Sequence, residues 1–145
     1  MASSISTPAV PGYRFDAPPD IRDLATRERL SQSAVDGFFA IMERWRIPQT
    51  IQTELLGGIS RSKLNTMKTA AGTLSIDQLF RVSYIVGIYK ALHILLNNEL
   101  ADQWMTRPND DFLFQGEAPL NLVLSRGLLG LATVRNLLDA ARGGK

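Results

Sequence analysis

The stretch that decides the fold covers residues 48–72 and reads PQTIQTELLGGISRSKLNTMKTAAG. Its leading proline suits the start of a short helix, which we expect to end where Gly57 and Gly58 give the backbone freedom for a turn. Ser60 can then cap a second helix that continues to Ala71. A short helix, a glycine turn and a second helix in this order predict a helix-turn-helix unit.

The second helix of this unit divides into an apolar side and a basic side. Its apolar residues, Ile59, Leu64 and Met67, have the spacing that anchors a recognition helix to its domain. The other residues are the predicted DNA-binding set, to which the nearby Arg81 adds a basic group: Arg61, Ser62, Lys63, Asn65 and Lys68. Lys and Arg neutralise phosphates, and Arg and Asn can bind base edges in the major groove. A merely solvated face is the alternative, but the cap, turn and anchors together favour DNA binding.

The composition limits the class of protein around this unit. The chain has 145 residues and is 45% hydrophobic, which is enough for a globular core. Sixteen Lys and Arg against 14 Asp and Glu leave a net charge of +2, so any nucleic-acid face must be local. Cysteine is absent, which fits a reducing compartment. With no signal-peptide pattern and no apolar run of about 18 residues, we expect a cytoplasmic protein without a membrane partner.

Helices are also expected on the N-terminal side of the unit. Residues 1–19 are rich in Ser, Ala and Pro, a composition that predicts a flexible arm. Asp20 is a plausible N-cap for a short helix over Ile21–Leu30. Ser31 then predicts the start of a second helix, which runs to Arg46.

On the C-terminal side, Ser75 and Gln78 form a capping-box pattern in front of a long helix over Ile76–Asn97. Its apolar residues exceed one stripe, so we expect either a central core helix or part of a dimer interface. Shorter helices follow at Asn98–Thr106, Pro119–Gly127 and Leu131–Arg142. No segment alternates with a period of two, so the fold class is predicted to be all-α.

The sequence contains no group of residues that indicates a catalytic or metal-binding site. His93 is the only histidine and lies in an apolar helix, where a structural role is expected. Asp110 and Asp111 are adjacent loop acids without a third ligand. No phosphate-binding or dinucleotide motif accompanies Gly57 and Gly58. We therefore expect a binding protein rather than an enzyme, with no catalytic residue, metal or cofactor.

The C-terminal half carries residues in a fairly specific order: Trp104, Pro108-Asn109, Gly116, Pro119-Leu120, Leu122 to Leu124, Gly127, Val134, Leu137-Leu138 and Gly143. In this order it resembles the toxin-binding domain of the Xre, MbcA and ParS antitoxin family. Such antitoxins place an Xre-type helix-turn-helix ahead of this domain. Their Leu-Gly-Ile-Ser entry reads here Leu56-Gly57-Gly58-Ile59-Ser60. The resemblance covers residues 31–143.

The resemblance implies an all-α protein in which an Xre-like helix-turn-helix bundle, residues 20–97, is joined by the long central helix to a small toxin-binding domain, residues 98–145. Family members bind a RES-domain toxin, a NAD-degrading enzyme, block its active site and repress their own operon. The resemblance assigns the DNA role to Arg61, Ser62, Asn65 and Lys68. It assigns the toxin role to the last two helices and to Arg135, Arg142, Gly143 and Gly144.

Two further expectations concern assembly and the competing function. A palindromic operator needs two copies of the reading helix, so we expect a homodimer or a larger toxin–antitoxin assembly. The alternative is a stand-alone helix-turn-helix transcriptional regulator whose C-terminal helices serve only oligomerisation.

Overall fold

The computed structural model describes residues 20–143, so the arm expected at residues 1–19 lies outside the described part. The described chain is helical and contains no strand, which confirms the all-α fold class. Its α-helices are α1 (Leu24–Trp45), α2 (Gln49–Leu55), α3 (Arg61–Thr69), α4 (Ile76–Leu95), α5 (Asn98–Gln103), α6 (Pro119–Arg126) and α7 (Leu128–Gly143). Two short 3-10 turns, η1 (Trp104–Thr106) and η2 (Phe112–Phe114), lie between α5 and α6. Within residues 20–143, no helix is both long and apolar enough to cross a membrane.

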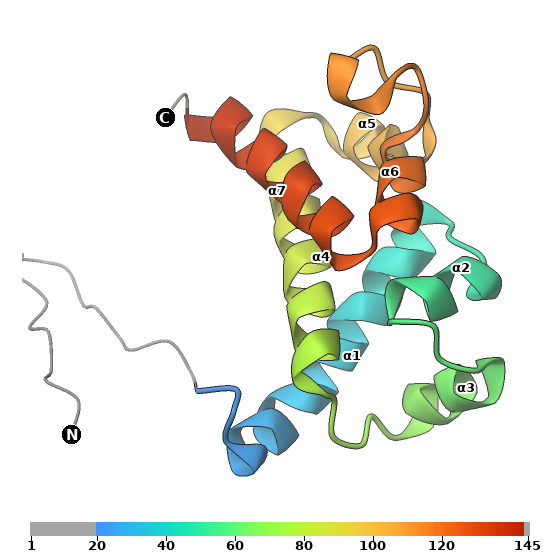
Figure 1. The fold of residues 1–145 in the computed structure, drawn as a ribbon, viewed down its shortest axis with the longest axis vertical. Coiled ribbons are helices and arrows are strands. Elements are labelled where there is room, and N and C mark those ends of the chain that lie inside the picture. The colour runs from blue at the N-terminus through green and yellow to red at the C-terminus, as the bar shows by residue number, and fades with distance from the viewer. Residues whose placement is uncertain (1–19, 144–145) are drawn as a thin grey trace, which may run out of the picture.

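Helix α4 lies at the centre of the fold, between α1 and α7 (Figure 1). Its side chains Ile85, Ile88 and Leu92 are fully buried in a continuous hydrophobic core that includes residues from both halves of the chain. Helix α6 packs on α7, and α3 packs on α2 and α1. Because α4 is covered on two sides, this packing accounts for most of the apolar residues that exceeded one stripe. Four apolar side chains of α4 remain exposed: Ile76, Phe80, Ile94 and Leu95.

Helix α1 is continuous, so the prediction of two helices meeting at Ser31 was wrong. Asp23, rather than Asp20, caps it. Ser31 lies fully buried within the helix, where its Oγ donates to the Arg27 carbonyl at 2.6 Å and accepts from the Leu74 amide at 2.9 Å. A serine that bonds back to its own helix does not need to end it. Its second partner, far along the chain, is not visible in a local pattern.

Ser31→Ala is expected to lower the free energy of unfolding by about 1–2 kcal/mol, because the Leu74 amide loses its acceptor in a buried place. Urea denaturation followed by circular dichroism measures the change. The matched control is Ser33→Ala, on the exposed side of the same helix, which should stay within about 0.5 kcal/mol of the parent. Equal stabilities of the two variants would contradict the role given to Ser31.

The predicted caps of α3 and α4 are confirmed. Ser60 accepts a hydrogen bond from the Lys63 amide at 3.0 Å, and Ser75 and Gln78 form the complete capping box. Helix α3 ends at Thr69, slightly before the expected Ala71.

The C-terminal helices differ more from expectation at their ends. Helix α5 ends at Gln103 and the chain continues as the 3-10 turn η1 instead of a regular helix to Thr106. Helix α7 begins at Leu128 rather than Leu131, directly after Gly127. The pattern missed this first turn because Leu129, at 74% exposure, does not contribute to the buried stripe.

Candidate DNA-binding face and C-terminal domain

Helix α3 presents its predicted DNA-binding residues to solvent. Leu64 and Met67 are 0% and 1% exposed, so they anchor the helix as predicted. All five residues of the predicted set are exposed: Arg61, Ser62, Lys63, Asn65 and Lys68. The helix lies at one end of the molecule, away from α5 and the end of α7 (Figure 1). It is therefore accessible to a large, elongated ligand.

One residue outside the predicted set contacts this face. Gln49, the first residue of α2, donates from Nε2 to Oδ1 of Asn65 at 3.4 Å. This contact holds the Asn65 amide with its NH2 group free to donate elsewhere. The sequence could have indicated Gln49, because it follows Pro48 at the start of the first helix of the predicted unit, and that helix lies beside the second.

Two threonines were also missed, although both are exposed on α3. The Thr66 hydroxyl donates to the Ser62 carbonyl at 3.1 Å, and the Thr69 hydroxyl donates to the Thr66 carbonyl at 2.9 Å. Each hydroxyl oxygen keeps acceptor capacity. The solvent-facing side of α3 is therefore polar beyond the predicted basic residues.

The basic groups of this region are distributed differently from expectation. Lys68 lies on the side of α3 that faces α1, with its Nζ 5.4 Å from the centre of the Phe39 ring. Arg81 does not join the face, because it pairs with Asp77 at 2.7 Å and its side chain is only 16% exposed. A Cβ atom on Gly57 would lie 3.5 Å from Nε of Arg81, so this guanidinium lies against the glycine turn.

The two arginines assigned to toxin binding, Arg135 and Arg142, lie beside the carboxylate of Asp139. Arg135 donates from Nε to both oxygens of Asp139 at 3.1 Å, and Nη1 of Arg142 lies 3.9 Å from the same side chain. The Arg135 guanidinium also occupies the space that a Cβ atom on Gly87 of α4 would need, and the Arg135 side chain is 30% exposed. Arg142 and Gly143 end α7 at the surface, whereas Gly144 lies outside the described residues.

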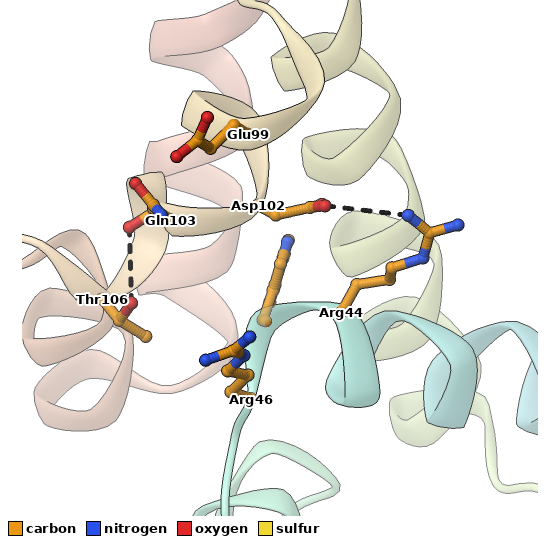
Figure 2. A pocket seen from close by; sticks show the side chains of 7 residues that line it. Arg44, Arg46, Glu99, Asp102, Gln103 and Thr106 are labelled. Atoms are coloured by element: carbon orange, nitrogen blue, oxygen red, sulfur yellow. Dashed lines mark hydrogen bonds and ion pairs between the residues drawn. The ribbon is translucent and has the colours of Figure 1, made fainter.

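The junction between α1 and α5 is a cleft of about 360 Å³ (Figure 2). Asp102 of α5 lies 3.8 Å from Nη1 of Arg44 and 3.0 Å from Nε2 of His93. The other histidine nitrogen, Nδ1, is 3.0 Å from Oδ1 of Asn98, and the ring packs against Tyr89 at a tilt of 39° with centres 4.2 Å apart. These contacts place His93 in a bridge between helices. Within residues 20–143, no group of three or more acidic or histidine side chains is arranged to hold a metal ion.

Comparison with known proteins shows which family the chain is related to. Residues 90–144 match the model of the antitoxin Xre/MbcA/ParS C-terminal toxin-binding domain, from the last turns of α4 through α7. The uncharacterized protein y4oB of Sinorhizobium fredii is 42% identical over 111 residues, which cover 76% of this chain and 84% of y4oB. The chain therefore belongs to the same family as y4oB, and its residues 90–144 match the antitoxin Xre/MbcA/ParS C-terminal toxin-binding domain.

Proposed function

We propose that this protein is the antitoxin of a type II toxin–antitoxin system. In this proposal it binds a RES-domain, NAD-degrading toxin, blocks the toxin's active site and represses its own operon by binding DNA. The observation that carries the toxin-binding part is the match of residues 90–144 to the toxin-binding domain family. The RES identity of the toxin follows from the family resemblance.

The DNA-binding part of the proposal rests on the exposed face of α3. Arg61 and Ser62, at the start of the helix, and Asn65 one turn later are placed to read base edges, since the first residues of a recognition helix enter the major groove. Lys63 and Lys68 flank them and supply charge for phosphates. No acidic residue occurs between Ile59 and Ile76, so this face attracts DNA although the whole chain carries a net charge of only +2.

We assign the two roles to different ends of the molecule. Residues 20–97 carry the DNA-reading helix and residues 98–145 the toxin-binding surface. Helix α3 and the segment between α5 and α6 lie at opposite ends in Figure 1. A bound toxin would therefore leave α3 accessible, and we propose that a homodimer or larger toxin–antitoxin assembly binds a palindromic operator.

Co-expression tests the proposed function. The RES toxin encoded by a neighbouring gene is produced from an inducible promoter, with or without this protein from an unrelated promoter. We expect the toxin alone to stop growth, and the pair to grow and to co-purify as a complex. The variant Arg61→Ala/Asn65→Ala should rescue growth equally, which separates neutralisation from repression. If the toxin stays active and unbound when it is co-expressed with the full-length protein, the antitoxin proposal is wrong and a stand-alone regulator is favoured.

A further inference from the structure

Phe112 is a large aromatic side chain that projects from the toxin-binding domain into solvent. It is 92% exposed, whereas the next most exposed large apolar residue among residues 20–143, Leu129, is 74% exposed. The residue two positions further, Phe114, is 4% exposed and packs edge-on against Trp104 with ring centres 5.7 Å apart. The turn η2 thus directs one phenyl ring into the core and the other outward.

The loop around Phe112 is held by its own hydrogen bonds. Asp111 caps η2 by accepting from the Leu113 amide at 2.9 Å, and Asn109 accepts from the Asp111 amide at 2.8 Å. The Asn109 amide donates to the Glu117 carbonyl at 3.1 Å, which closes the loop. A side chain displayed on an ordered loop loses little conformational entropy on binding, and burying its ring removes apolar surface from water.

A hollow lies beside this loop. It has a volume of about 350 Å³, and its apolar lining comes from Leu95, Leu96, Trp104, Leu137 and Ala141. Asn109 and Asp111 of the loop also line it. The loop and the hollow both lie within the residues that match the toxin-binding domain. The ring that projects from this loop can insert into a pocket of a partner, and the hollow that the loop borders can receive an apolar side chain of the same partner.

The charges near Phe112 indicate the kind of partner. Three exposed acidic residues, Asp110, Asp111 and Glu117, accompany one exposed base, Arg107, in this segment. Two copies of this surface facing each other around a two-fold axis would bring the acidic groups together. DNA is disfavoured for the same reason. A different protein with basic side chains around an apolar pocket is complementary.

We infer that Phe112 and the adjacent hollow form the docking surface for the toxin, which receives the phenyl ring in an apolar pocket bordered by basic side chains. The inference rests on the proposed function and specifies the contact surface that it uses. Phe112 is the anchor of this surface, and the acidic residues around it set the orientation of the bound toxin.

The test measures binding of the full-length protein to the purified neighbouring RES toxin by isothermal titration calorimetry. Phe112→Ala is expected to raise the Kd roughly 30-fold, the usual scale for a central aromatic anchor. Phe112→Leu should retain most of the affinity. Leu24→Ala is the matched control, because Leu24 is 54% exposed on α1 and its truncation should leave the Kd unchanged. Circular dichroism should show equal folding, since Phe112 contributes little to the core.

A second variant tests the hollow independently of Phe112. Ala141 is exposed on α7, so Ala141→Phe should fill the hollow without disturbing the core and should also raise the Kd at least tenfold. If the wild-type protein binds the toxin and neither Phe112→Ala nor Ala141→Phe raises the Kd, the proposed docking surface is wrong and the antitoxin proposal stands. Absence of wild-type binding would overturn both. If light scattering shows that Phe112→Ala dissociates a homodimer while the toxin Kd is unchanged, the occupant is a second copy and the inference is wrong.

Discussion

The double variant Arg61→Ala/Asn65→Ala is expected to bind its operator roughly 100-fold more weakly than the wild-type protein. A good contact from Arg or Asn to a base edge contributes about 1–3 kcal/mol of discrimination, and the variant removes two candidates for such contacts. Both side chains are exposed on α3, so their loss should leave the fold unchanged. Fluorescence anisotropy with the operator fragment at fixed salt measures the effect, because phosphate contacts make affinities depend on salt.

The matched control removes the same two residue types outside α3, one between η1 and η2 and one on α7. Arg107→Ala/Asn136→Ala deletes one exposed arginine and one exposed asparagine. It lowers the net charge equally and should keep operator affinity close to wild type. Gln49→Ala should give a smaller loss than the double variant, because it only releases the Asn65 amide. An operator affinity that survives the loss of Arg61 and Asn65 would refute the assignment of α3 as the reading helix.

Gly130→Ala is expected to lower the free energy of unfolding by about 2–3 kcal/mol, in the range found when atoms are forced into a packed core. A Cβ atom on Gly130 would lie 2.8 Å from the Leu122 carbonyl oxygen and 2.8 Å from Cα of Val123. Both are backbone atoms of α6, so relief requires α6 and α7 to move apart. Chemical denaturation measures the loss, and the packing of α6 on α7 is the part of the fold that should be affected.

Gly37→Ala is the control for this substitution. Gly37 is also a helical glycine, but a Cβ atom there would meet only Cγ2 of Val86, at an ordinary distance of 3.9 Å. Alanine should therefore raise the free energy of unfolding by about 0.5–1 kcal/mol through its higher helix propensity. Stabilisation by alanine at both positions would contradict the close approach of α6 and α7.

The sequence was sufficient for the caps of α3 and α4, whose partners lie within about one helical turn of each other. Ser60 caps α3 by accepting from an amide three residues away. At the start of α4, the side chain of Ser75 accepts from the Gln78 amide and the side chain of Gln78 accepts from the Ser75 amide. The apolar spacing of Leu64 and Met67 likewise predicted which side of α3 is buried. Such features depend on helix geometry, which local sequence determines.

The tertiary structure decided what each side chain meets across the fold. The Oγ of Ser31 accepts from the Leu74 amide, 43 residues along the chain, and the Arg81 guanidinium lies against the Gly57 turn. Neither contact is visible in the local pattern, which predicted a cap at Ser31 and a place in the basic face for Arg81.

Phe112 and Phe114 show the limit of local pattern most clearly. They have the same side chain in the same short turn, and their opposite exposures depend on the packing of one ring against Trp104. The sequence alone determined the all-α fold class and predicted the candidate reading face of α3, although it divided α1 into two helices. Burial depends on contacts between distant segments, so only the tertiary structure determined which apolar side chains complete the core and which remain exposed.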